Sequence, residues 1–322
     1  SWLQKKLHQF ILSSQFIKEI TFEIESLLIS TSNKDDKHVF VTGLARSGST
    51  ILLNAIHRSN LFGSLSYLDM PFILAPNLWS KIYTHNSKTN DKLVERAHKD
   101  GIEISLKSPE AFEEVFWKTF DSKIFIKNKF KKFVDLVSHK YRKDRYLSKN
   151  NQNINRLEVI SKIFPNSKIL IPFREPTQHA NSLLHQHKKF IEYSKNDIFV
   201  ANYMKWIGHT EFGPNYIPFV KKINYDDDKN INHWIEQWHL TYRKCLEIQK
   251  KNQNIIFVCY EDLCRSEKYW INLLEILDIK NKYNFNFKES KNKIKKDLDP
   301  ILIREADFLY VKLKEINSKL YT

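Results

Sequence analysis

Cysteine is scarce in this chain: Cys245, Cys259 and Cys264 are the three that occur among 322 residues. They form neither a C-x-x-C pair nor the dense pattern of a small domain stabilised by disulfides. The pattern therefore indicates buried thiols in a reducing compartment, and we expect a cytoplasmic protein.

The chain also lacks a long apolar segment. No run approaches the roughly 20 apolar residues that are needed to span a bilayer, and no signal peptide is visible at Ser1. The first residue is Ser and not Met, which leaves room for a native N-terminus or an anchor that has been cut away. No internal repeat or linker stands out, so we predict a single domain over residues 1–322.

The charge is strongly positive, with 52 Lys and Arg against 37 Asp and Glu and a formal net charge of +15. A basic surface attracts a polyanionic cofactor, an acidic acceptor, nucleic acid or anionic lipid. Lys and Asn are frequent along the whole chain, however, so composition explains most of the charge. Among the basic residues that produce this charge, we assign a functional role only to Arg46, Lys149 and Arg174. We predict no nucleic-acid partner.

A candidate phosphate-binding loop occupies residues 43–50, directly after the apolar run 38–42. Its outline is G-x-x-x-x-G-x-[ST], at the junction of a strand and a helix. NTPase loops carry Lys after the second Gly; here Ser49 stands there, and the basic group lies inside the loop as Arg46. Backbone N–H groups and a helix N-terminus still favour an anion at this position.

A second candidate phosphate site follows the apolar run 168–173, which reads as a buried parallel strand. Arg174 stands at its carboxyl end, and Pro176 fits the first turn of a helix, where a missing N–H costs nothing. Ser182 lies on that helix, eight residues after Arg174. An Arg and a hydroxyl so placed can hold one phosphate from two sides.

Together these residues resemble the sulfotransferases that use 3'-phosphoadenosine 5'-phosphosulfate (PAPS), among them the tyrosylprotein and carbohydrate enzymes. In that family a loop [KR]-S-G-[ST]-T binds the 5'-phosphosulfate, and R-x-P with a later Ser binds the 3'-phosphate. The matching residues are Arg46, Ser47, Gly48, Ser49 and Thr50 in the first motif, and Arg174 and Ser182 in the second. Residues 147–150, 160–168 and the Y-E-D-L segment 260–263 extend the resemblance over about residues 38–280.

The order of apolar segments predicts an α/β protein with a P-loop-type three-layer fold, a central parallel sheet flanked by helices and extra helical segments. We expect an N-terminal helical extension (1–37), a PAPS-binding core (38–280) and a C-terminal loop and helix (281–322). The predicted strands are 38–42, 168–173 and 255–259. The predicted helices include 49–59, 108–120 with Ser108 as N-cap, 176–190 and 232–249, whereas 121–155 is expected at the surface and 191–230 shows no clear period.

The resemblance implies transfer of a sulfuryl group from PAPS to an acceptor hydroxyl, which leaves 3',5'-ADP. A saccharide or small metabolite is the favoured acceptor, and the oligomeric state stays open. Arg46 and Lys149 are expected to stabilise the charge that develops on the leaving phosphate. Because the sulfuryl group is already activated, no metal is expected.

The acceptor requires a general base. Asp69 is the first candidate, with a role in a turn or helix cap as its equal alternative. Glu113 is the second, on a predicted helix face that Glu110, Glu114 and Trp117 share. His98 is a third. The family's C-terminal R-K-G loop is missing, and Lys288, Lys291 or Lys293 are candidates to replace it.

Two other functions stay open at this point. A nucleotide-dependent kinase would share the loop, but Ser49 replaces its lysine and no Asp ends the second strand. A catalytically inactive protein that binds nucleotides or polyanions would explain the charge but not the two paired phosphate motifs.

Overall fold

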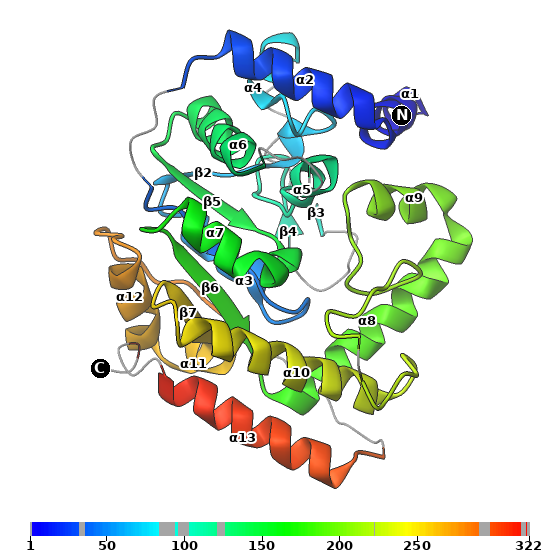
Figure 1. The fold of residues 1–322 in the computed structure, drawn as a ribbon, viewed down its shortest axis with the longest axis vertical. Coiled ribbons are helices and arrows are strands. Elements are labelled where there is room, and N and C mark those ends of the chain that lie inside the picture. Colours follow the sequence, from blue (N-terminus) through cyan, green and yellow to red (C-terminus); the bar gives the residue numbers. More distant parts are fainter. Residues whose placement is uncertain are drawn as a thin grey trace. The chain divides into compact units, whose positions relative to one another are not determined.

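Five strands build the central sheet of the computed structural model, which describes residues 2–31, 36–83, 94–95, 103–120, 126–221, 223–289, 297–316 and 320. They are β1 (Val39–Val41), β2 (Phe62–Gly63), β5 (Arg145–Lys149), β6 (Lys168–Phe173) and β7 (Ile255–Cys259). Their order is β2-β5-β1-β6-β7 (Figure 1), and β2 runs parallel to β5 as β6 does to β7. Buried apolar runs such as β7 are typical of parallel strands, and the predicted α/β class is confirmed.

The chain forms two compact units. Unit 1 comprises Ser1–Val39, Thr50–Asn150 and Trp206–Gly208, and unit 2 comprises Phe40–Ser49, Asn151–Lys205 and His209–Thr322. The single domain expected from the sequence, with divisions after residues 37 and 280, stays a prediction.

Unit 1 is mainly helical. Its helices are α1 (Trp2–Ser13), α2 (Gln15–Leu28), α3 (Ser49–His57, whose first residue belongs to unit 2), η1 (Tyr67–Asp69), α4 (Pro76–Ile82), α5 (Glu114–Phe120) and α6 (Ile126–Tyr141). An antiparallel pair, β3 (Val94–Glu95) and β4 (Glu103–Ile104), completes its described part.

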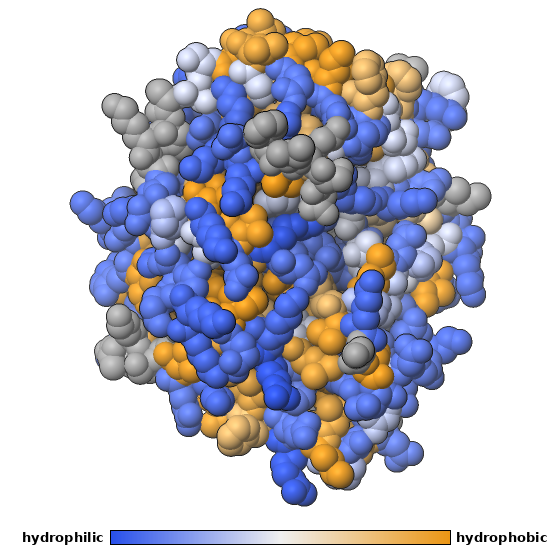
Figure 2. Space-filling model, in the orientation of Figure 1, coloured by the Kyte–Doolittle hydropathy of each residue, from blue (hydrophilic) through white to orange (hydrophobic). Residues whose placement is uncertain are grey.

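An aromatic cluster forms the core of unit 1. The rings of Phe116 and Phe133 are stacked with centroids 4.9 Å apart, and those of Trp117 and Phe130 lie 4.4 Å apart. Such packed aromatic pairs add to the burial of their large apolar surfaces. On the outside, α2 leaves several large apolar side chains exposed (Phe16, Ile20, Ile24, Leu27 and Leu28), and Figure 2 shows apolar residues gathered where Figure 1 places this helix.

Unit 2 carries the other helices. They are η3 (Asn151–Arg156), α7 (Leu157–Ile163), α8 (Pro176–Asn196), α9 (Ile198–Trp206, whose last residue belongs to unit 1), α10 (Ile231–Gln249), α11 (Tyr260–Arg265), α12 (Glu267–Ile276) and α13 (Pro300–Ile316). Figure 1 shows α10 running between α8 and α13. Trp234, Trp238 and Tyr242 of α10 are buried in this core, as the sequence predicts.

Two predictions about the chain between residues 108 and 155 are wrong. The helix expected from Ser108 begins at Glu114, because Pro109 pairs with Ser66 in an isolated bridge and Ser108 Oγ accepts a hydrogen bond from Ser105 N at 2.9 Å. The stretch 121–155, expected at the surface, contains α6 and the sheet strand β5. In the described part of the chain, no helix is long and apolar enough to cross a membrane.

Candidate functional site

The candidate phosphate loop lies in unit 2 between β1 and α3, and its shape depends on Gly48. That residue has φ +94°, and a Cβ placed there would lie 2.3 Å from Cδ2 of Tyr260. No side chain fits in such a space. The loop is therefore packed against the first residue of α11, which is the Tyr of the Y-E-D-L segment.

Three of the predicted binding residues meet at this loop. Arg46 Nε donates a hydrogen bond to Ser182 Oγ at 3.3 Å, and Arg174 Nη1 donates to the carbonyl oxygen of Arg46 at 3.3 Å. The loop motif and the strand-end motif, which are 128 residues apart, are thus brought together as the sequence analysis expects. Arg46 itself has φ +69°, a left-handed conformation that costs a non-glycine residue about 1–2 kcal/mol.

The hydroxyl residues of the loop are buried. Ser47 is fully buried, and its Oγ has no hydrogen-bond partner among the described residues. Ser49 and Thr50 are also buried, in the first turn of α3. A buried hydroxyl that makes no hydrogen bond is a reason to look for a ligand at the loop.

His179, a buried residue of α8 that supports the loop, is not among the residues predicted from the sequence. Its Nε2 lies 2.7 Å from the carbonyl oxygen of Ala45, so the ring donates a proton there. Burial lowers the pKa of His179 to about 3, and the positive charges of Arg174 and Arg46 act in the same direction. The ring is therefore neutral at physiological pH. Its position three residues before Ser182, on the same side of a helix, was the signal that could have identified it.

Tyr260 and Glu261 are further residues whose contacts at this site the sequence did not reveal. The guanidinium of Arg174 lies 5.6 Å from the centroid of the Tyr260 ring, within range of a cation–π contact. Tyr260 Oη donates a hydrogen bond to the carbonyl oxygen of Lys288 at 3.1 Å. The backbone of Lys288, a candidate replacement for the R-K-G loop, therefore lies next to the Tyr260 ring that packs against the phosphate loop. Lys291, Lys293 and His98 lie outside the described residues.

Asp69, the first candidate base, lies in unit 1 and is fully buried at the end of η1. Its Oδ2 accepts hydrogen bonds from Ser66 N at 2.7 Å and Tyr141 Oη at 2.6 Å, and Oδ1 pairs with the Lys140 ammonium group. The contact with Ser66 N is part of a capping box. The role in a helix cap that the sequence analysis left open is thus present in the structure, and the catalytic role stays a prediction.

Glu113, the second candidate, also lies in unit 1 and is 1% exposed. Trp117 Nε1 donates to its Oε1 at 3.0 Å, and Tyr146 Oη donates to its Oε2 at 3.1 Å. Burial raises the pKa of Tyr146, and the nearby Glu113 carboxylate raises it further, so this hydroxyl keeps its proton. Since α5 begins at Glu114, the three acidic residues do not share one helix face as predicted.

The other carboxylates and Lys149 are also in unit 1. Asn150 Nδ2 donates to Glu114 Oε2 at 2.8 Å, and Tyr67 Oη donates to Glu110 Oε2 at 2.9 Å. Lys149 is the last residue of β5, at the carboxyl end of a parallel strand, where ligands of α/β sheets bind.

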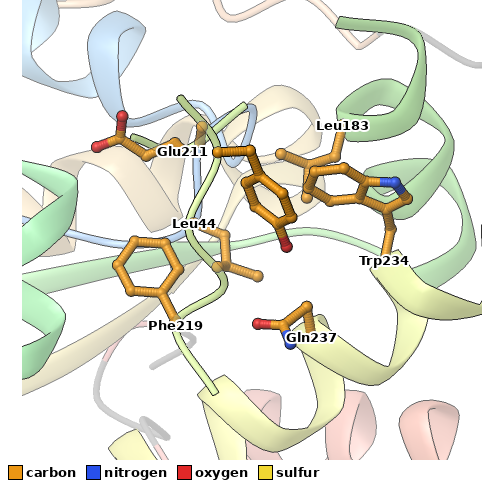
Figure 3. A pocket seen from close by; sticks show the side chains of 8 residues that line it. Leu44, Leu183, Glu211, Phe219, Trp234 and Gln237 are labelled. Carbon is orange, nitrogen blue, oxygen red and sulfur yellow. The ribbon is translucent and has the colours of Figure 1, made fainter. Parts of the chain in front are cut away.

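A small cavity lies behind the phosphate loop within unit 2. Figure 3 shows Leu44 of the loop, Leu183 of α8, and Trp234 and Gln237 of α10 around it, with Phe219. It leaves about 10 Å³ for the centres of water-sized molecules, which is room for roughly one water. In this structure it is too small to hold an acceptor.

Comparison with known proteins identifies one family. The model described as "Sulfotransferase family" matches residues 38–210, more than half of the chain. No curated protein matches the sequence.

Solved structures of bacterial sulfotransferases are similar in outline. The sulfotransferase STF1 from Mycobacterium tuberculosis is 10% identical with a TM-score of 0.48, and the match covers 99% of this chain and 86% of that one. STF9 from Mycobacterium avium is 10% identical with a TM-score of 0.44, over 97% and 78% of the two chains. A sulfotransferase from Alicyclobacillus acidocaldarius is also 10% identical, with a TM-score of 0.36 over 88% and 94%.

Proposed function

The chain belongs to the sulfotransferase family, and from this premise we propose that it transfers a sulfuryl group from PAPS to the hydroxyl group of an acceptor. One observation carries the proposal: the phosphate loop, Arg174 and Ser182 meet in unit 2 through the hydrogen bonds of Arg46. A P-loop kinase carries its lysine at the position that Ser49 occupies here.

The residues present fit PAPS. The buried Ser47 hydroxyl makes no hydrogen bond within the described part of the chain, and two guanidinium groups lie beside the loop. Ser47, Gly48, Ser49 and Thr50 would hold the 5'-phosphosulfate, and Arg174 and Ser182 the 3'-phosphate. When bound, PAPS supplies a sulfuryl group that its bond to phosphate has already activated.

The chain's part in the reaction is positioning and charge stabilisation, as in phosphoryl transfer. Arg46 stabilises negative charge on the leaving phosphate oxygen, and we assign the same role to Lys149 at the end of β5. The helix N-terminus of α3 adds the partial positive charge of its free N–H groups. A saccharide or a small metabolite is the proposed acceptor.

We propose that either Glu113 or Asp69 removes the acceptor's proton. The contacts of Glu113 with Trp117 and Tyr146 are made by neutral donors, whereas Asp69 closes a capping box and pairs with an ammonium group. These surroundings favour Glu113 as the base and a structural role for Asp69.

A cytoplasmic location is also part of the proposal. Cys245 and Cys259 are free and buried, and Cys264 is free and half-buried. Free thiols of this kind suit a reducing compartment.

Calorimetry with the product 3',5'-ADP tests the proposed function. The wild-type protein should bind 3',5'-ADP more tightly than 5'-AMP, which lacks the 3'-phosphate, and should not require magnesium. Arg174→Ala should weaken the binding of 3',5'-ADP and leave the binding of 5'-AMP nearly unchanged. Preference for Mg-ATP, or equal binding of 3',5'-ADP and 5'-AMP, would contradict the proposal. Transfer of radiolabelled sulfate from PAPS to a panel of saccharides and alcohols then identifies the acceptor.

A further inference from the structure

Glu261, the second residue of α11, reaches the two residues that precede α8. Its side chain is buried, and its Oε1 accepts a hydrogen bond from the backbone N of Glu175 at 3.1 Å. The same oxygen lies 3.8 Å from Arg174 Nε, an ion pair whose side chains are 11% and 7% exposed. Because water screens such a pair little, the carboxylate acts strongly on the direction of the guanidinium.

The other oxygen of Glu261 is held from α13. Tyr310 Oη donates to Glu261 Oε2 at 3.3 Å, and the Cys259 thiol lies 3.5 Å from the same atom. Burial raises the pKa of Tyr310, and the nearby Cys259 and Glu261 raise it further, so the hydroxyl keeps its proton and donates. One turn further along α13, Lys314 pairs with the neighbouring Asp262 at 3.1 Å.

Arg174 is thus directed from several sides by other residues of the chain. Glu261 faces its Nε, the carbonyl oxygen of Arg46 accepts from its Nη1, and the Tyr260 ring lies beneath its guanidinium. A long Arg side chain loses considerable rotamer freedom when it is fixed. Fixing it in advance removes that loss from the binding step and strengthens binding.

We infer that Glu261 is a positioning residue that directs Arg174 toward the 3'-phosphate, and that Tyr310 of α13 holds Glu261 in place. The inference rests on the proposed function, and in it Glu261 and Tyr310 act through Arg174. It also assigns a role to the C-terminal helix, which is far in sequence from both phosphate motifs.

The test compares 3',5'-ADP with 5'-AMP by calorimetry. Glu261→Gln keeps an oxygen that can accept from Glu175 N but loses the charge that faces Arg174. We expect this variant to bind 3',5'-ADP about tenfold more weakly than wild type and 5'-AMP equally well. Tyr310→Phe, which removes only the hydroxyl group, should weaken the binding of 3',5'-ADP about threefold.

Asp262→Asn is the matched control, because it makes the same chemical change one residue along α11, where the partner is Lys314. It should leave the affinity for 3',5'-ADP within twofold of wild type. A merely structural role for Glu261 would lower the affinity for both nucleotides together, and that result would overturn the inference.

A double-mutant cycle identifies the path of the effect. If Glu261 acts through Arg174, then Glu261→Gln has no effect on 3',5'-ADP binding once Arg174→Ala is present. The same tenfold loss in that background would overturn the inference while the proposed function stands. If the wild-type protein does not prefer 3',5'-ADP to 5'-AMP, the proposed function fails, and the inference fails with it.

Discussion

Replacing Gly48 with Ala is the sharpest test of the phosphate-loop geometry. The added Cβ would lie 2.3 Å, 2.6 Å and 3.0 Å from Cδ2, Cε2 and Cγ of Tyr260. The ring is buried, and its hydroxyl is fixed to the carbonyl oxygen of Lys288, so it has little freedom to move away. Any shift also disturbs the contact with Arg174.

Two costs add in this variant. Overpacking of a filled site costs about 1–3 kcal/mol, and a non-glycine residue at φ +94° costs about 1–3 kcal/mol of backbone strain. We therefore expect the free energy of unfolding, measured with urea, to fall by about 2–6 kcal/mol. Calorimetry should show weaker binding of 3',5'-ADP in parallel.

The variant Tyr260→Ala separates the two costs. With the ring removed, Gly48→Ala should cost only its backbone part, about 1–3 kcal/mol, so the two substitutions should be strongly non-additive. A loss below about 0.5 kcal/mol for Gly48→Ala in the wild-type background, or full additivity with Tyr260→Ala, would refute the packing argument.

Further predictions concern buried titratable groups. His179→Gln should make stability less sensitive to acid: the folded-state pKa is about 3 and the unfolded value about 6.5, so wild type loses stability as the pH falls from 6.5 toward 3. Over most of that pH range, the free energy of unfolding measured with urea should fall by about 1.4 kcal/mol less per pH unit in the variant than in wild type. Burial raises the pKa of Asp135 to about 6, and because the side chain is only partly buried, solvent screening reduces the cost of its charge. Asp135→Asn should therefore stabilise the protein at pH 7 by about 1–2 kcal/mol, and this gain should vanish as the pH falls through 6 toward 3.8. Glu113→Gln should abolish sulfuryl transfer and leave 3',5'-ADP binding intact, whereas Asp69→Asn should lower the melting temperature and keep measurable turnover; the reverse pattern would make Asp69 the base.

Elements with an uninterrupted apolar run or a clear cap could be predicted from the sequence. The strands β6 and β7 have the predicted bounds, and α8 begins at Pro176 as expected, with Glu175 as its N-cap. In each case the signal is local. The phosphate loop could also be predicted from a local signal, because the spacing of Gly43 and Gly48 and the hydroxyl residue that follows identify it.

The missed elements depend on contacts that are distant in sequence. The strand β5 is only five residues long and has Arg145 and Lys149 at its ends, so its composition resembles a surface segment. The many lysines of α6 conceal the buried residues Phe130, Phe133 and Val137, which recur at helical spacing. The residues 108–113 have a good helix-start pattern, but pairing of Pro109 with Ser66 outweighs local propensity.

The same distinction explains what the sequence could reveal of the site. Arg46 has a left-handed backbone conformation, which glycine adopts much more readily than arginine. The conformation is held by hydrogen bonds that the loop's own carbonyl groups accept, from His179 to Ala45 and from Arg174 to Arg46. The motifs identify Arg46 and Arg174 themselves, whereas the hydrogen bonds that join the loop to α8 and to the residue after β6 depend on the fold. The guanidinium groups of Arg46 and Arg174 therefore stand at the same loop, and positive charge gathered there favours an anionic ligand.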